Sequence, residues 1–131
     1  MKKLNNITVA LTTNFDQTKN IVKAKDTLMT FIENPRESES VWTLPESDKN
    51  RNNFLNCVVS GETHYGMPQL EKAFKYIEMK CGRTRSDDSR GIAKMNIKLL
   101  QYGEESFNTE YRNKEYVQKL LQESVPATTE D

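Results

Sequence analysis

Two polar side chains, those of Asn96 and Lys98, lie two residues apart in the segment 95–102. This segment alternates apolar and polar residues as a half-buried β-strand does, so both side chains are expected to project from the same face. An asparagine offers a metal ion one neutral oxygen, and a lysine offers no acceptor at all. The pair therefore predicts a polar, cationic spot on a strand, with no metal bound there.

Carboxylates occur nearby in the sequence, at Asp87 and Asp88. They belong to the segment 83–91, which contains no apolar residue and is therefore predicted to be a solvated loop. A magnesium ion requires oxygen ligands held in nearly octahedral geometry. Because a loop does not fix side chains as a strand does, we do not expect these two carboxylates to replace strand-borne ligands.

Three further side chains could bind a ligand through hydrogen bonds or charge, those of Asn56, Glu78 and Arg83. An amide in a central strand needs hydrogen-bond partners, which are either a bound ligand or the neighbouring backbone. An arginine can hold two phosphate oxygens at once. Glu78 and Arg83 are equally explained as a solvated helix face and its end. The residues alone leave both alternatives open.

The sole histidine and the two cysteines carry little chemical signal. His64 falls in a turn after an apolar strand, where it is expected to face solvent or to cap. Cys57 and Cys81 fit no zinc spacing and are too few for a disulfide scaffold. Each lies in an apolar segment, so both are interpreted as small buried hydrophobic residues.

The elements that must position these residues can be predicted from hydrophobic periodicity. Strands are expected over 7–13, 37–44, 54–59 and 95–102, where β-branched or alternating residues occur. Helices are expected from Asp16 to about Asn34, where Pro35 follows, and from Pro68 to Gly82. A last helix is expected over 110–123. Residues 46–53 read as a polar loop, and 125–131 as a frayed tail.

This order of elements predicts an α+β fold of the ferredoxin-like type. In the split βαβ arrangement, βαββαβ, an antiparallel sheet carries both helices on one face. The last helix is additional to that arrangement. The length of 131 residues favours one domain, which we place at 1–124, followed by the tail 125–131.

Composition excludes several classes of partner. The chain has 19 basic and 19 acidic residues and is 35% hydrophobic, so no long-range field favours nucleic acid or an anionic membrane. No segment approaches the roughly 20 apolar residues of a membrane span, and no signal peptide is indicated. A cytoplasmic location is therefore expected. Nothing in the sequence identifies a protein partner.

Three stretches of the chain, taken in order, resemble the 6-hydroxymethyl-7,8-dihydropterin pyrophosphokinase family. Residues 9–14 resemble the family's first strand and its Gly-Ser-Asn turn. Residues 41–45 and then 54–56 are similar to its next motifs, ending in Tyr-Leu-Asn. Residues 77–103 resemble a stretch that ends in an Asp-Leu-Asp strand and a glycine. The resemblance implies an enzyme that transfers the terminal pyrophosphate of ATP to a pterin alcohol.

The resemblance also implies roles for individual residues. Asn56 would face the pterin ring, in a pocket lined by Thr43, Pro45 and Phe54. Glu78 would lie near the nucleotide, and Arg83 near its phosphates.

The family's two magnesium-binding aspartates fall on Asn96 and Lys98. The formal charge at these two places changes from minus two to plus one, which repels a divalent cation. The family's glycine in the first turn falls on Thr12, and an aromatic residue and an arginine fall on Arg90 and Ala93. After Gly103 the chain also lacks the family's segment with a histidine, an arginine and a pterin-stacking phenylalanine, which implies a divergent, C-terminally shortened member.

These departures predict a degenerate relative that has no catalytic residue and needs no cofactor. A first alternative is an active pterin pyrophosphokinase with displaced metal ligands, which would use magnesium and ATP. A second is a metal-free module that binds a pterin or another phosphate-bearing small molecule, with Lys98 as a built-in cation. A third is a purely structural or interaction protein.

Overall fold

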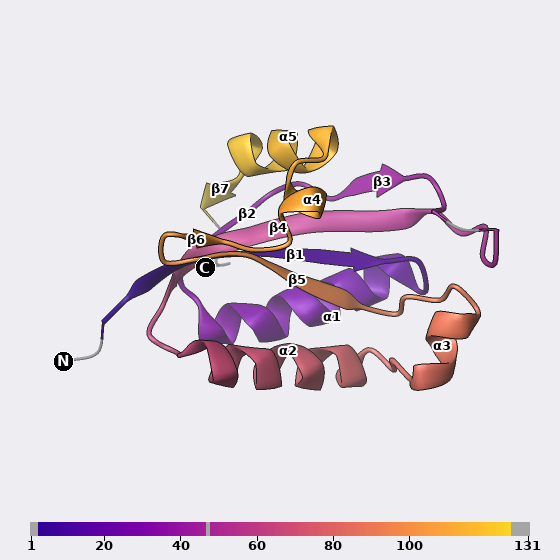
Figure 1. Ribbon diagram of the computed structural model, residues 1–131, viewed down its shortest axis with the longest axis horizontal. Helices are drawn as coiled ribbons and strands as arrows, with labels where there is room; N and C mark the ends of the chain where they lie inside the picture. Colours follow the sequence, from indigo (N-terminus) through magenta and orange to yellow (C-terminus); the bar gives the residue numbers. More distant parts are fainter. Residues whose placement is uncertain (1–2, 47, 127–131) are drawn as a thin grey trace, which may run out of the picture.

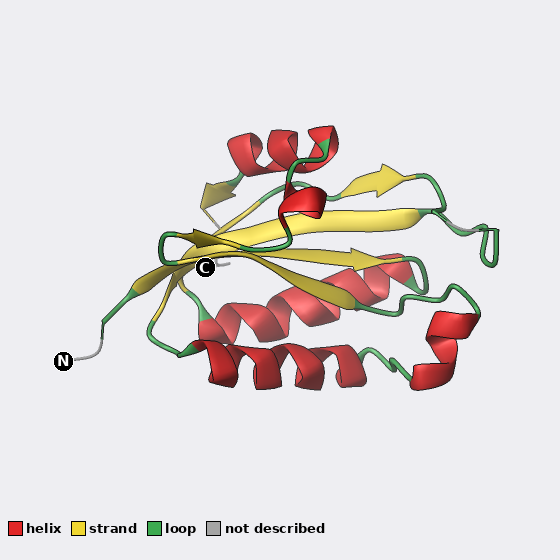
Figure 2. Ribbon diagram, in the orientation of Figure 1, coloured by secondary structure: helices red, strands yellow, loops and turns green. Residues whose placement is uncertain are grey.

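The computed structural model describes residues 3–46 and 48–126, which form one antiparallel sheet with helices on both faces (Figures 1 and 2). The strands are β1 (Asn5–Thr13), β2 (Glu33–Glu37), β3 (Val41–Thr43), β4 (Phe54–Thr63), β5 (Asn96–Tyr102), β6 (Glu105–Ser106) and β7 (Val125–Pro126). The helices are α1 (Gln17–Leu28), α2 (Met67–Lys80), α3 (Arg85–Ser89), α4 (Thr109–Arg112) and α5 (Glu115–Glu123), with a short 3-10 turn η1 (Met29–Phe31) after α1.

The sheet is built around β1. Its strands follow the order β6-β5-β1-β4-β2-β7, and β3 also pairs with β4. β1 pairs with β4 over its whole length, from Asn5 opposite Thr63 to Thr13 opposite Leu55. On its other side β1 pairs with β5, and every pairing is antiparallel. The predicted α+β class with an antiparallel sheet is therefore confirmed.

Two hydrophobic cores lie on opposite faces of this sheet. Alternation along β1 directs Ile7, Val9 and Leu11 into the core beneath α1 and α2, as predicted for the two helices. The intervening Ala10 faces the other way, where α5 covers the sheet (Figure 1). That second cluster consists of Ala10, Val58, Leu100, Val117 and Leu120.

The strand predicted over 37–44 corresponds to β3 and to Glu37, the last residue of β2, and the rest of β2 precedes the predicted range. Between them Ser38 stays on β4, because its backbone N–H donates to Val58 O and its Oγ accepts the Val58 N–H. Pro35, interpreted as a helix stop, lies inside β2 where the register with β4 shifts. A proline is compatible with a strand at such an irregularity because no ladder donor is required there.

Two further predictions were wrong in detail. Residues 83–91 are not a solvated loop, because they contain α3 and bury Asp87 completely. The helix expected over 110–123 is interrupted after Arg112, giving α4 and α5. The predicted tail begins at Val125, where the chain pairs with β2 as β7. Residues 127–131 of that tail lie outside the described residues.

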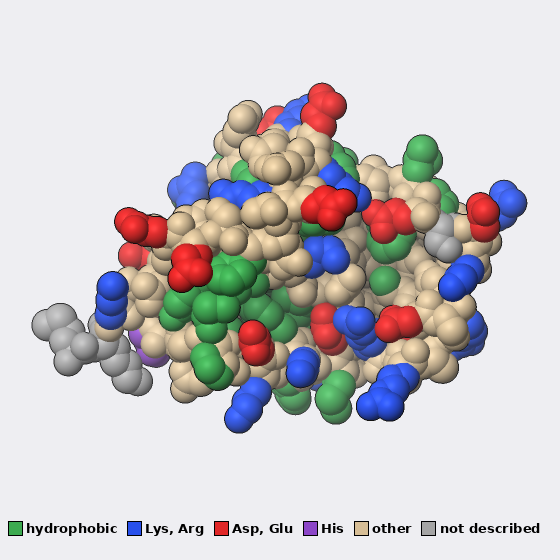
Figure 3. Space-filling model, viewed as in Figure 1, with side chains coloured by type: hydrophobic (Ala, Val, Ile, Leu, Met, Phe, Trp, Pro, Cys, Tyr) green, Lys and Arg blue, Asp and Glu red, His purple; other side chains and the backbone are tan. Residues whose placement is uncertain are grey.

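Within residues 3–46 and 48–126, every helix is too short or too polar to cross a lipid bilayer. Charged side chains of both signs are interspersed over the face shown in Figure 3 and do not gather in one patch.

Two adjacent residues of α1 differ in burial and provide a test of how this helix packs against the sheet. Ile21 is 2% exposed and Val22 is 51% exposed. We expect Ile21→Ala to lower the free energy of unfolding by about 2–5 kcal/mol, since it leaves a cavity in the core. Val22→Ala should change that free energy by no more than about 0.5 kcal/mol. Urea unfolding followed by circular dichroism measures both, and equal effects of the two variants would contradict the packing of α1.

Candidate functional site

A cavity of about 790 Å³ lies where β1 ends and β5 begins. Its floor includes Thr12 of β1 and Asn96 and Lys98 of β5. Its walls come from three segments that are distant in sequence, within 46–54, 88–93 and 108–114. We call it the β5 cavity. Of the helices that carry its lining residues, α3 lies toward the right-hand side of Figure 1 and α4 lies above the middle of the sheet.

The strand register explains which side chains form the floor. Asn56, Thr12 and Asn96 are directly opposite one another across β4, β1 and β5. Two residues further along, Val58, Ala10 and Lys98 form the next row. The first row is polar. The second row leads into the core beneath α5, so Lys98 lies at the border between the cavity and apolar side chains.

Lys98 is a half-buried cation. Its Nζ lies 5.3 Å from the centre of the Tyr111 ring, a cation–π contact. Among residues 3–46 and 48–126, no carboxylate lies within ion-pair distance of this ammonium. Burial is the main cause that lowers the pKa of Lys98. The negative charge of Glu46 opposes this shift, and the positive charge of Lys114 adds to it. A charge without a counterion is therefore held at the floor of the cavity.

Lys114 and Glu46 lie at the cavity wall. Lys114 Nζ is 5.7 Å from the centre of the Tyr111 ring and 3.4 Å from Glu46 Oε2. The ion pair connects the loop after β3 to the residue that precedes α5. Burial raises the pKa of the Tyr111 hydroxyl above its ordinary range, so this phenol stays neutral.

Asn56 does not line the β5 cavity, although its row does. It is 1% exposed, and its Oδ1 accepts the Thr12 hydroxyl at 2.6 Å. Its Nδ2 donates to Val41 O at 3.1 Å and to Thr43 Oγ1 at 3.0 Å. Both donor hydrogens of the amide are thus directed to the protein itself.

The other residues assigned to a pterin pocket lie near Asn56 along β3 and β4, with Thr43 opposite Phe54, but they do not all line this cavity. Thr43 holds the Asn56 amide, and Pro45 lines a smaller cavity of about 520 Å³. Phe54 does line the β5 cavity. Of the four residues, the structure brings only Phe54 to the same cavity as Asn96 and Lys98.

Glu78 and Arg83 contact each other and do not line the β5 cavity. Their closest atoms are 2.9 Å apart. Glu78 Oε2 also accepts the backbone N–H of Ile97 at 3.0 Å, between the two cavity residues of β5. Arg83 approaches Asp88, a wall residue, at 3.8 Å. This series of contacts links the C-terminal end of α2 to β5 and to the cavity wall.

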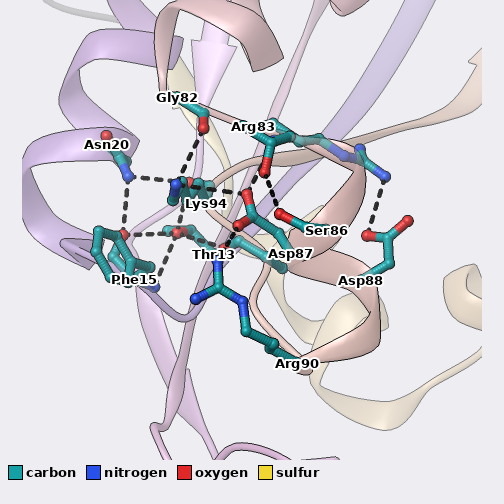
Figure 4. Close-up of polar contacts among 12 residues, drawn as sticks. Thr13, Phe15, Asn20, Gly82, Arg83, Ser86, Asp87, Asp88, Arg90 and Lys94 are labelled. Atoms are coloured by element: carbon teal, nitrogen blue, oxygen red, sulfur yellow. Dashed lines mark hydrogen bonds and ion pairs between the residues drawn. The ribbon is translucent and has the colours of Figure 1, made fainter.

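Asp87 is a fully buried carboxylate near the cavity, and three neighbouring groups bind its oxygens (Figure 4). It accepts the backbone N–H of Thr84 at 2.9 Å, and its oxygens lie 3.1 Å from Arg90 Nη2 and 3.5 Å from Lys94 Nζ. The hydrogen bond from the Thr84 backbone is the main cause that lowers the pKa of Asp87. The spacing from Thr84 to Asp87 is that of a capping box, a signal present in the sequence that the reading of a solvated loop missed.

Asn14 and Thr13 fix the loop that precedes β5. Asn14 Nδ2 donates to Gly91 O at 2.8 Å, and its Oδ1 accepts the Ala93 N–H at 2.7 Å. Thr13 Oγ1 donates to Lys94 O at 2.7 Å. Sequence reasoning treated Asn14 only as a turn residue. Its buried position beside the cavity was not apparent from local pattern.

The histidine and cysteines lie away from the cavity lining. His64 Nδ1 is 2.9 Å from Glu33 Oε2. Cys57 and Cys81 are buried free thiols, as predicted, and burial raises the pKa of Cys57 to about 11. Cys57 is therefore a poor nucleophile at neutral pH.

The residues present do not fit a divalent metal ion. No group of three or more His, Cys, Asp or Glu side chains that could hold a metal occurs in the two described ranges. Hard cations take several oxygen ligands, whereas the floor of the β5 cavity offers one amide oxygen beside an ammonium. The arrangement is suited to an anion or a hydrogen-bonding ligand.

A family model described as 7,8-dihydro-6-hydroxymethylpterin-pyrophosphokinase matches residues 8–126. A search of curated proteins finds no match.

The Asp87 network predicts an acid-dependent loss of stability. Because the pKa of Asp87 is lowered on folding, the unfolded state binds more protons as the pH falls below about 4. The stabilisation by the ionised carboxylate is therefore complete above that pH, and it is lost as the pH falls through the lower pKa of the folded state.

We expect Asp87→Asn to lower the urea midpoint at pH 7 and to differ less from the wild type at pH 2. Asp88→Asn is the matched control, because its side chain is 70% exposed. A constant difference between Asp87→Asn and the wild type across this pH range would contradict the assignment.

Proposed function

Since the chain belongs to the 7,8-dihydro-6-hydroxymethylpterin-pyrophosphokinase family, we propose that it retains a ligand-binding cavity but does not catalyse magnesium-dependent pyrophosphoryl transfer. Family membership supports a protein of the folate-biosynthesis pyrophosphokinase type. The loss of the transfer step is our own inference from the β5 cavity. We also propose that the protein acts in the cytoplasm, as its composition suggests.

One observation carries the proposal: Lys98 contributes a half-buried ammonium at a place where the family keeps a metal-binding aspartate. Transfer of a pyrophosphoryl group depends on positioning and on neutralising the charge that develops between the phosphates. At these two places an aspartate pair would attract a divalent cation, and the Asn96 and Lys98 pair repels it. An ammonium can offset anionic charge, but it cannot bridge oxygens of two phosphates as a coordinating ion does.

The neighbouring carboxylates do not restore such a site. Asp87 is held by Thr84 and Arg90, which cap α3, and by Lys94 in the loop before β5. Asp88 lines the cavity, but its side chain is 70% exposed and belongs to a short helix. One exposed carboxylate does not provide the converging oxygens that magnesium requires.

The aromatic wall supports a planar ligand. Phe54 lines the β5 cavity together with Tyr111. A pterin or another flat ring is the ligand class we propose for this wall. In the described arrangement the Asn56 amide is paired with Thr12 and Thr43, so a pterin would have to displace those hydrogen bonds to reach it.

The proposal predicts that restoring carboxylates to β5 introduces metal dependence. Isothermal titration with a non-hydrolysable ATP analogue should show that magnesium does not raise the affinity of the wild type. The double variant Asn96→Asp, Lys98→Asp should bind the analogue more tightly with magnesium than with EDTA, by about tenfold or more, because two carboxylates then face the cavity. Lys72→Asp adds an acidic residue at an exposed position of α2, away from the cavity. Magnesium should not raise the affinity of this variant for the analogue.

A coupled assay with magnesium, ATP and hydroxymethyldihydropterin provides the decisive counter-test. Turnover by the wild type that Asn56→Ala abolishes would overturn the proposal. If Asp88→Asn also abolished that turnover, the enzyme would use displaced metal ligands.

A further inference from the structure

Two lysines and one tyrosine form a cluster in the β5 cavity. The Nζ atoms of Lys98 and Lys114 lie 5.3 Å and 5.7 Å from the centre of the same Tyr111 ring. All three residues line the cavity. Like charges repel one another, and Lys114 accordingly contributes to lowering the pKa of Lys98. Because Glu46 pairs with Lys114, the uncompensated positive charge at this part of the cavity is that of the half-buried Lys98.

The Asn96 amide lies on the same floor and is available for binding. Within residues 3–46 and 48–126, its side chain takes part in no intramolecular hydrogen bond. It is half-buried and lines the cavity two residues before Lys98 on the same face of β5. A neutral donor therefore lies beside an ammonium that has no carboxylate partner among those residues.

The acidic residues of the cavity are distributed differently. Glu46, Asp88 and Glu110 also line it, but all three are exposed and belong to the walls, as Lys114 does, whereas Lys98 is half-buried on the floor. Glu46 is paired with Lys114, and Asp88 approaches Arg83. Exposed charges are weakened by water, whereas a half-buried charge acts more strongly on a ligand that replaces its solvent. The floor therefore determines which ligand charge is preferred.

We propose that Asn96, Lys98 and Lys114 form a metal-independent binding site for a phosphate-type oxyanion in the β5 cavity. Such an anion accepts several charge-assisted hydrogen bonds at once, which matches two ammonium groups and one amide donor. The cavity volume of about 790 Å³ admits the anion either alone or as part of a larger molecule. The inference deepens the proposed function, because it names the ligand class of the same cavity.

The test is isothermal titration with sodium pyrophosphate in EDTA at low ionic strength. We expect the wild type to bind without metal and Lys98→Met to lose about tenfold in affinity or more, equivalent to about 1.4 kcal/mol. Lys98→Arg keeps the charge and should keep most of the affinity. Glu46→Gln should bind more tightly than the wild type, because it releases Lys114 from its ion pair and removes a negative charge from the wall.

Lys72→Met is the matched control, since it removes an exposed lysine of α2 on the opposite face of the sheet. It should bind pyrophosphate as the wild type does. Thermal unfolding of each variant verifies that it is folded, and the Lys98→Arg and Glu46→Gln results test the inference even if Lys98→Met is unstable. A parallel titration with AMP distinguishes a site for free anions from one for a nucleotide phosphate, and binding of either supports the inference.

Four results would overturn the inference: no binding of either ligand in EDTA, equal losses in Lys98→Met and Lys72→Met, weaker binding by Glu46→Gln, or binding that requires magnesium. The proposed function fails on a different measurement, which is turnover in the coupled assay. A protein that shows neither turnover nor anion binding would therefore contradict the anion site but not the proposed loss of catalysis.

Discussion

Two of the three wall segments of the β5 cavity, 46–54 and 88–93, are hydrogen-bonded to Asn14. Its amide bonds to Gly91 and Ala93 fix the loop that leads into β5, and its backbone N–H donates to Ala93 O. Its own carbonyl accepts the Asn52 side-chain amide from the loop after β3. Asn14 is 1% exposed, so water competes little for these bonds. The position of these two walls relative to Asn96 and Lys98 therefore depends on hydrogen bonds to this residue, which directly follows β1, and to the neighbouring Thr13.

The chemistry of the cavity follows from where β5 passes between polar and apolar surroundings. Side-chain alternation puts Asn96, Lys98 and Leu100 on one face, and Leu100 is fully buried beneath α5. Lys98 is consequently drawn partly into apolar surroundings, which is unfavourable for its ammonium. Contact with the Tyr111 ring offsets part of this cost, by about 0.5–2 kcal/mol. The remaining imbalance is what makes an anionic ligand more favourable there than a cation.

Periodicity was sufficient to predict the elements whose stability comes from one continuous apolar face. Helices α1 and α2 and strands β1, β4 and β5 each carry such a face. β2 was missed because its sequence, with Pro35 and Arg36, has no strand pattern, and only pairing with β4 keeps it extended. The burial of Asp87 was equally hidden, because it depends on Arg90 and Lys94 converging on α3. The two-residue spacing was sufficient to predict that Asn96 and Lys98 share one face of a strand. The hydrogen bonds that hold the Asn56 amide could not be predicted in this way, because one partner lies on another strand.

That partner is Thr12, which by the resemblance to the family stands in place of a glycine. A glycine has no side chain to contact the neighbouring strand. Here the Thr12 hydroxyl donates to Asn56 Oδ1 at 2.6 Å across the β1 and β4 pair. Thr43 then accepts from the same amide, so the Asn56 side chain is held between two strands. On its other side Thr12 faces Asn96, which the same resemblance places where the family has the first of its two metal-binding aspartates. By that resemblance the polar row from Asn56 to Asn96 departs from the family at its centre as well as at its end, and at its centre the hydroxyl of Thr12 occupies the Asn56 amide oxygen with a hydrogen bond inside the protein.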